Sequence, residues 1–261
     1  MSKNFELLQR VGRTRGQSHE RHVELDTEMM GGTRLILANP PTAPATSKHK
    51  PISTNKLMRE ELVKLAQRLF LLPGAFKSIV FSGIDQDNGC DRVCAQVGEI
   101  LDNQAPRSIC LVDANFPRPS LHEYFDVSND GGLTDAVLQS GPVTDYARRL
   151  RGANLWLVPP GTIGSEWPTL VNSDRMRVRI QELCDLYDHV LIAAPPIAMY
   201  VDALHLGKLV DGMVLVLQAN TTRRETARKV KQEMEAASVR LLGAVLNERT
   251  FPIPESIYSR L

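Results

Sequence analysis

The sequence predicts a doubly wound α/β domain with a mainly parallel sheet. Short, largely apolar runs of β-type residues alternate with segments of helical periodicity. Strands that are apolar throughout are typical of a parallel sheet with helices on both faces. The chain of 261 residues, 43% of them hydrophobic, is long enough for one such domain and its core. The predicted strands are residues 78–82, 108–112, 155–158, 189–193, 213–217 and 242–246.

Helices are expected before and between these strands. In residues 57–72 apolar side chains recur at helical spacing with charges between them, and Pro73 and Gly74 end the pattern. Residues 175–186 and 223–237 show helical patterns as well. These segments supply the layers that a parallel sheet needs on its two faces.

The first 50 residues differ from the rest of the chain. Residues 10–22 are rich in Arg, Gly, His and Ser, and residues 39–47 are rich in Pro, Thr and Ala. A proline-rich stretch cannot hold a helix, because proline lacks the backbone donor and restricts the residue before it. We therefore expect a flexible arm and linker over residues 1–50 and one folded domain over residues 51–261.

Composition excludes several classes of protein. The chain has 31 Lys and Arg against 30 Asp and Glu, which argues against nucleic acid held by a basic field along the whole sequence, although a local patch remains open. No apolar run approaches the ~18 residues that cross a bilayer, and no signal peptide is evident, so we expect a cytoplasmic chain. We expect buried free thiols and no metal site, since the cysteines are too scattered for a disulfide framework; they are Cys90, Cys94, Cys110 and Cys184.

A glycine-bearing loop follows the first strand, where a phosphate-binding loop would lie. Ligands of open α/β sheets bind at the carboxyl ends of the strands, and the amides at a helix N-terminus attract phosphate. A working loop also needs a lysine after its last glycine, followed by a hydroxyl residue. Here Cys90 and Asp91 follow Gly89. On this loop alone, a phosphate-binding loop and an ordinary tight turn both remain open.

Several segments at the strand ends, taken in order, carry a family resemblance. They are the loop at 82–92, residues 113–122 (Asp-Ala-Asn-Phe-Pro-Arg-Pro-Ser-Leu-His), 132–135 (Gly-Leu-Thr-Asp), 188–196 and 243–247. Together they resemble the cytoplasmic kinase domain of bacterial tyrosine kinases of the CpsD/CapB type, relatives of the deviant-Walker partitioning ATPases. The resemblance covers about residues 50 to 247. It implies a P-loop NTPase-like fold, ATP and Mg²⁺ as cofactors, and a role in capsule and exopolysaccharide synthesis.

The resemblance assigns roles to five residues that keep the family pattern. Gly89 matches the last glycine of the Walker A loop, and Asp113 matches a catalytic carboxylate near Mg²⁺. Asn247 matches an asparagine that contacts the nucleotide base. Arg118 matches an arginine of the second motif, and Asp202 matches an acidic residue after the Pro-Pro turn.

The groups that would handle phosphate charge are mostly replaced. Cys90 stands at the Walker A lysine, Ala193 at the Walker B aspartate and Asn115 at the second aspartate of the motif. Phosphoryl transfer depends on cations that neutralise the phosphates, so these losses remove several kcal/mol of transition-state stabilisation. Asp91 stands at the hydroxyl position, and its negative charge interacts favourably with the dipole at the start of the helix. We therefore expect a loop that is stable without a ligand. Arg92 is either a substitute cation or a solvated surface residue, and Cys90 is either a nucleophile or a structural thiol.

Two further family features are incomplete. The kinases form rings through a helix with two arginines, and the matching positions here are Lys64 and Gln67. The helix Leu57–Leu72 could therefore form a homo-oligomer or simply pack against the domain. The kinases also end in a cluster of tyrosines, whereas Tyr258 is the single tyrosine of the last 13 residues and is a candidate phosphosite or a packing residue.

The leading hypothesis is a kinase-like module, a pseudo-kinase, that regulates or scaffolds exopolysaccharide assembly with nucleotide binding weak or lost. The resemblance implies a partner, the cytoplasmic part of a membrane chain-length or copolymerase protein, which would bring the chain to the inner membrane. One alternative is an active ATP-dependent protein-tyrosine autokinase whose rearranged loop uses Arg92 with Asp113 and Mg²⁺. A second is a partitioning-type ATPase, which the missing lysine weakens.

Overall fold

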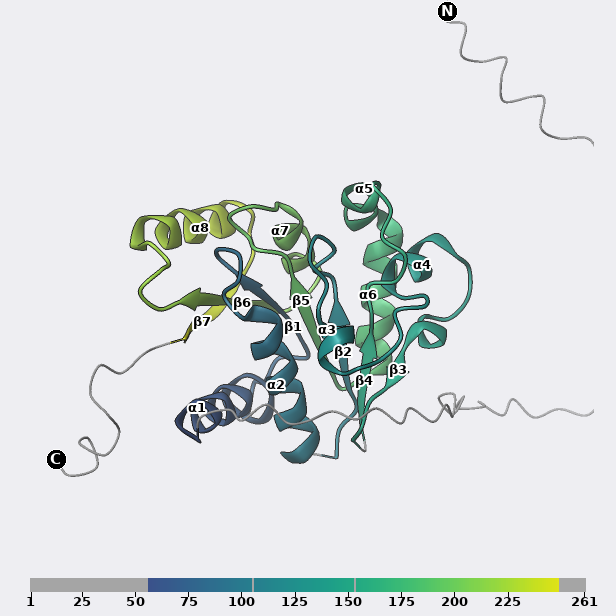
Figure 1. Cartoon of the computed structure of the whole chain (residues 1–261), viewed down its shortest axis with the longest axis horizontal. Helices are drawn as coiled ribbons and strands as arrows, with labels where there is room; N and C mark the ends of the chain where they lie inside the picture. The colour runs from purple at the N-terminus through teal and green to yellow at the C-terminus, as the bar shows by residue number, and fades with distance from the viewer. Residues whose placement is uncertain (1–55, 105, 153, 249–261) are drawn as a thin grey trace, which may run out of the picture. The chain divides into compact units, whose positions relative to one another are not determined.

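The computed structural model describes residues 56–248, except residues 105 and 153. They form a seven-stranded sheet in the order β3-β4-β2-β5-β1-β6-β7, in which only the β3–β4 pair is antiparallel (Figure 1). The strands are β1 (Ser78–Gly83), β2 (Ile109–Asp113), β3 (Arg148–Arg149), β4 (Leu155–Val158), β5 (His189–Ala194), β6 (Gly212–Gln218) and β7 (Leu241–Asn247). The predicted doubly wound fold is confirmed. All six predicted strands are present, each end within one residue of its expected position. The arm and linker predicted over residues 1–50 lie outside the described residues.

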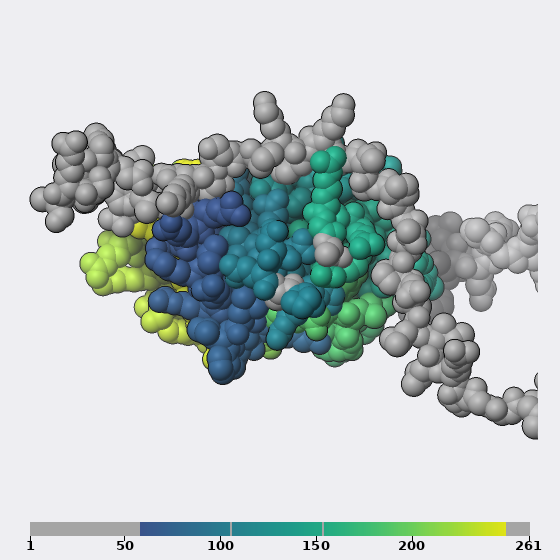
Figure 2. Space-filling view, turned by 90° about the horizontal axis from the view of Figure 1, so that it is seen from below, coloured from purple at the N-terminus to yellow at the C-terminus, as the bar shows by residue number. Residues whose placement is uncertain are grey.

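Helices cover both faces of the sheet. One face carries α1 (Lys56–Ala66), its continuation η2 (Gln67–Leu71) and α2 (Cys90–Gln104); Figure 2 views the molecule from this side, with α1 and α2 in purple to blue. The opposite face carries α4 (Leu133–Leu138), α5 (Trp167–Val171), α6 (Asp174–Leu186), α7 (Asp202–Gly207) and α8 (Arg224–Ala236). Two short elements, α3 (Leu121–Tyr124) and η3 (Val143–Tyr146), lie in the connections.

Two apolar cores explain why the central strands are largely apolar. On β1, the side chains of Ile79 and Phe81 belong to the core under α1 and α2, whereas Val80 belongs to the core under the opposite helices. Successive side chains of a strand point to opposite faces, so a strand covered on both sides needs apolar residues at every position.

The predicted helix 57–72 is confirmed, with an altered last turn. It is α-helical over Lys56–Ala66 and π-helical over Gln67–Leu71. Phe70 is fully buried, and its ring meets that of His189 at 5.1 Å. Leu72, the last apolar position of the pattern, is 53% exposed. Packing of this turn under the sheet fixes its geometry, which the spacing of apolar residues does not encode.

The helices predicted over 175–186 and 223–237 correspond to α6 and α8. The prediction of buried free thiols is confirmed for all four cysteines. Within residues 56–248 as described, no helix is both long and apolar enough to cross a membrane.

Candidate functional site

A cleft of ≈ 1410 Å³ opens where β1, β2, β5 and β7 end, and α1 forms part of its wall. This is the edge of an open α/β sheet where ligands bind. Seven of the predicted site residues line the cleft together: Gly89, Cys90, Asp91, Arg92, Asn115, Arg118 and Asn247. The structure therefore brings together segments that are far apart in the sequence, as the resemblance implied.

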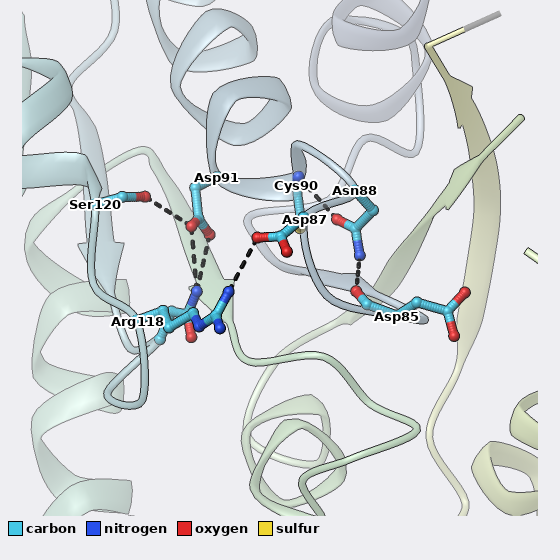
Figure 3. Close-up of polar contacts among 8 residues, drawn as sticks. Asp85, Asp87, Asn88, Cys90, Asp91, Arg118 and Ser120 are labelled. Carbon is cyan, nitrogen blue, oxygen red and sulfur yellow. Dashed lines mark hydrogen bonds and ion pairs between the residues drawn. The ribbon is translucent and has the colours of Figure 1, made fainter. Parts of the chain in front are cut away.

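The loop between β1 and α2 is filled by one of its own side chains. The Oδ1 atom of Asn88 accepts a hydrogen bond of 2.9 Å from the backbone N–H of Cys90, and its Nδ2 donates to the carbonyl of Asp85 (Figure 3). The side chain lies so close to the loop that a Cβ added to Gly83 would be 1.6 Å from its Nδ2. Asn88 was not among the predicted site residues, although asparagine often bonds in this way to the backbone N–H two residues further on.

Gly89 and Asn247 fit together at the end of this loop. Gly89 has φ +72°, a conformation that glycine adopts readily, and a Cβ there would lie 2.5 Å from Nδ2 of Asn247. That Nδ2 donates a buried hydrogen bond of 2.8 Å to the carbonyl of Asn88. Asn247, which the resemblance assigns to a nucleotide base, here holds the β1–α2 loop to the end of β7.

Asp91 lies in the first turn of α2 and contacts the loop that follows β2. Its Oδ2 accepts hydrogen bonds from Oγ of Ser120 at 2.7 Å and from Nδ2 of Asn115 at 3.1 Å. Figure 3 shows Asp91 and Ser120 facing each other across the two segments. Burial raises the pKa of Asp91, and the hydrogen bonds from Ser120 and Asn115 oppose that rise.

Asp113, the matched catalytic carboxylate, is fully buried below the cleft. Its Oδ2 accepts the backbone N–H groups of Ser120 at 3.0 Å and Leu121 at 2.9 Å, and its Oδ1 accepts that of Asn115 at 3.2 Å. Burial, with a further contribution from the nearby Asp91, raises the pKa of Asp113 to about 7, against the three backbone donors. In this arrangement the carboxylate holds the turn that begins α3.

The two arginines among the predicted site residues lie at the surface of the cleft. Arg92 is exposed on the first turn of α2. Arg118 donates a hydrogen bond of 3.0 Å to Oδ1 of Asp87, which links the β2–α3 loop to the β1–α2 loop (Figure 3). Both side chains of this ion pair are mostly exposed, so it adds little stability on its own.

The two positions that differ most from the family pattern are apolar and buried. Burial raises the pKa of Cys90 well above its ordinary value, and the charge of Asp91 adds to the rise, so the structural thiol is favoured over the nucleophile. Ala193 is fully buried on β5, where it pairs in register with Phe81 and Asp113.

The remaining predicted residues lie elsewhere. Asp202 is buried in the first turn of α7, where burial raises its pKa, and it does not line the cleft. Tyr258 lies outside the described residues. In the described part of the chain, no group of three His, Cys, Asp or Glu side chains is arranged to hold a metal ion.

Comparison with known proteins finds that the chain is similar to bacterial tyrosine kinases. The chain is 29% identical over 171 residues to tyrosine-protein kinase YwqD of Bacillus subtilis. The matched region covers 66% of this chain and 72% of that protein. It is 28% identical over 182 residues to the putative tyrosine-protein kinase CapB of Staphylococcus aureus, covering 70% and 79%. No family model matches the chain. The resemblance expected from the sequence is confirmed.

Solved structures agree on the fold. The chimerical protein CapA2B2 superposes with a TM-score of 0.69 at 24% identity, over 74% of this chain and 85% of that one. The septum site-determining protein MinD of Pyrococcus horikoshii, solved with Mg-ADP, superposes with a TM-score of 0.56 at 19% identity, over 70% and 76%. The P-loop NTPase-like fold is therefore confirmed.

Proposed function

We propose that this relative of bacterial tyrosine kinases is a pseudo-kinase, a module that keeps the kinase fold and cleft but does not transfer phosphate. The observation that carries the proposal is the chemistry at two positions of a cleft that is otherwise assembled. A buried thiol, Cys90, stands where the resemblance implies lysine, and a buried methyl group, Ala193, stands where it implies the Walker B aspartate.

The residues present do not fit Mg²⁺ and ATP. A phosphate-binding loop attracts phosphate through unpaired amides at a helix N-terminus and through its lysine. Here the N–H of Cys90 is already bonded to Asn88, and Asp91 places a carboxylate at the same helix end. Two negative groups at one helix end repel each other, so Asp91 disfavours a phosphate there.

The buried carboxylate does not compensate for these losses. Both oxygens of Asp113 are engaged by backbone N–H groups below the cleft. Asn115 keeps the shape of the second family aspartate without its charge and bonds to Asp91. Removal of the lysine and of a metal-organising carboxylate lowers transition-state stabilisation by several kcal/mol, which supports a module without kinase activity.

We further propose that the module regulates or scaffolds exopolysaccharide assembly. The support is the resemblance in the strand-end motifs, which in that family accompanies a partnership with a membrane chain-length or copolymerase protein. The partner would place the chain at the cytoplasmic face of the inner membrane. A helix such as α1, on the wall of the cleft, offers a surface for this contact or for a second copy of the chain.

Calorimetry on the full-length chain tests the proposal. We expect no measurable heat of binding with MgATP or MgADP at millimolar concentration, and no transfer of radiolabel from ATP to tyrosine. The Bacillus subtilis kinase serves as the positive control. Tight MgATP binding with label on Tyr258 would establish the autokinase alternative, with Arg92 as the substitute cation, and would refute the pseudo-kinase.

A gain-of-function variant completes the test. Cys90→Lys combined with Ala193→Asp returns the two missing charged groups. We expect this variant to recover measurable MgATP binding, because the lysine faces the phosphates and the aspartate organises the metal in related loops. A variant that folds as well as the wild type, judged by circular dichroism, but still binds nothing would show that the two substitutions are not the cause of the loss.

A further inference from the structure

The loop between β1 and α2 is tied by side chains to three other segments of the domain. Thr222, in the β6–α8 connection, donates a hydrogen bond of 3.0 Å to Asp85. Arg118 pairs with Asp87, and Asn247 donates to the carbonyl of Asn88. These contacts fix the loop from the sides of β2, β6 and β7. Side chains of the domain itself therefore hold the loop in place.

Asp91 adds a further contact between the start of α2 and the rest of the domain. It accepts hydrogen bonds from Ser120 at 2.7 Å and Asn115 at 3.1 Å, both on the segment between β2 and α3. Hydrogen bonds to an ionised acceptor are about twice as strong as neutral ones. The carboxylate also lies in the first turn of α2, where a negative charge interacts favourably with the helix dipole. One side chain therefore joins the start of α2 to the β2–α3 segment.

At positions 91 and 115 the carboxylate has moved from one residue of the pair to the other, relative to the family pattern. The resemblance implies a hydroxyl at position 91 and a carboxylate at position 115. This chain has the carboxylate at Asp91 and a carboxamide at Asn115. Two carboxylates at these positions would repel, whereas a carboxamide donates directly to a carboxylate. The two substitutions are complementary to each other.

We infer that the carboxylate of Asp91 braces the β1–α2 and β2–α3 segments against each other. Asn115 is the matched partner that makes the brace possible, and Ser120 is its second donor. The brace keeps the two rims of the cleft at a fixed separation. The inference deepens the proposed pseudo-kinase function and rests on it for the role of the cleft. The contact between Asp91 and Asn115 itself does not depend on that function.

A pair of substitutions, referred to below as the swap to the family pattern, tests the brace in the full-length chain. Asp91→Ser replaces the carboxylate with a shorter, neutral hydroxyl, and Asn115→Asp places a second carboxylate beside Asp91. Each single change should lower the thermal unfolding midpoint by at least ~4 °C, since each loses strong hydrogen bonds or adds repulsion. The double variant restores the hydroxyl and carboxylate of the family pattern. Its midpoint should lie at least ~4 °C above the value that the two single effects predict by addition.

Local hydrogen exchange separates a brace from a general loss of stability. In Asp91→Ser, amide exchange should rise at least ~10-fold in residues 84–89 and 114–120, with α6 and α8 less affected. Asp91→Asn, which keeps the shape and removes the charge, should give the same pattern at a smaller amplitude and covers the case in which Asp91→Ser does not fold.

Strict additivity of the two midpoints, or exchange that rises equally across the domain, overturns the brace. These results are independent of nucleotide affinity. If calorimetry finds tight MgATP binding while the swap is strongly coupled, the pseudo-kinase proposal fails and the brace between residues 91 and 115 stands. If no nucleotide binds and the swap is additive, the pseudo-kinase proposal stands and the brace fails.

Discussion

Replacing Asp113 with asparagine should destabilise the protein in acid and stabilise it above neutral pH. The carboxyl group of Asp113 is fully buried, and its pKa rises from an ordinary 3.8 to about 7 on folding. The folded state therefore holds a proton that the unfolded chain releases at much lower pH. The stability that this proton supports is complete below pH 3.8 and is lost as pH rises toward about 7.

The magnitude follows from the linkage between proton binding and folding. Each pH unit between the two pKa values lowers the free energy of unfolding of the wild type by ~1.4 kcal/mol, so a rise of about two units removes roughly 2–3 kcal/mol. The asparagine of the variant has no such proton. Its Nδ2 cannot accept the N–H that Oδ1 of Asp113 receives from Asn115, which costs about 1 kcal/mol at every pH. The two stability curves should therefore cross at about pH 4.5, and above that pH the variant should be more stable by a margin that grows up to about pH 7.

Urea unfolding followed by circular dichroism, from about pH 5 to about pH 8, measures this growing margin. The useful quantity is the difference between wild type and variant, because the titration of all other groups cancels. Asp188→Asn is the control: hydrogen bonds from Ser108 lower the pKa of Asp188, so its difference should be constant over the same range. A difference for Asp113→Asn that is flat to within ~0.5 kcal/mol would refute the reasoning.

Three further predictions follow from single contacts. His189→Phe should gain stability relative to the wild type as pH falls below 6.5, in thermal unfolding at acidic and alkaline pH, because burial lowers the pKa of His189 and the unfolded chain takes up the proton; equal shifts at both pH values would contradict this. Asn247→Ala should lower the free energy of unfolding by ~1–3 kcal/mol in urea, since the buried carbonyl of Asn88 loses its donor, whereas Asn172→Ala, which removes an exposed bond of the same kind, should change it by less than ~0.5 kcal/mol. Cys90 should resist iodoacetamide in the folded protein and react in urea, as read by mass spectrometry, because burial raises its pKa; rapid labelling of the native chain would revive the nucleophile.

Most of the strands were predictable because both of their faces are buried. Residues 190–193, for example, are apolar at every position, and in a chain of alternating strands and helices this pattern is typical of a strand covered on both sides. The edge strand β3 was not predictable in this way. It consists of Arg148 and Arg149, which pair with β4 through the backbone, and the guanidinium of Arg149 lies 5.9 Å from the ring centre of Trp156. These two residues are extended because they pair with β4, and their own sequence does not indicate a strand.

The candidate site was predictable as a set of positions, and less so as a set of contacts. The motif match indicated that Gly89, Asn115 and Asn247 belong to one cleft, and all three line it. It did not indicate that Asn88 fills the loop or that Asp91 joins two segments. The bond that Asn88 accepts from the N–H of Cys90 closes a local turn that an asparagine in a loop can signal. The contact of Asp91 with Ser120 depends on the packing of α2 beside the segment after β2, which no local pattern encodes.

The bond between Asn88 and Asn247 also bears on the order in which the molecule assembles. Its two residues are 159 positions apart in the chain, so the loop after the first strand is completed by the last residue of the last described strand. Contacts of such long sequence separation form late, because the intervening chain must be closed into a loop before they contribute. A chain that folds as it is synthesised would have its central sheet before this contact exists. Nascent chains that lack β7 therefore lack this contact, and the loop is then held by the side chains of Thr222, Arg118 and Ser120.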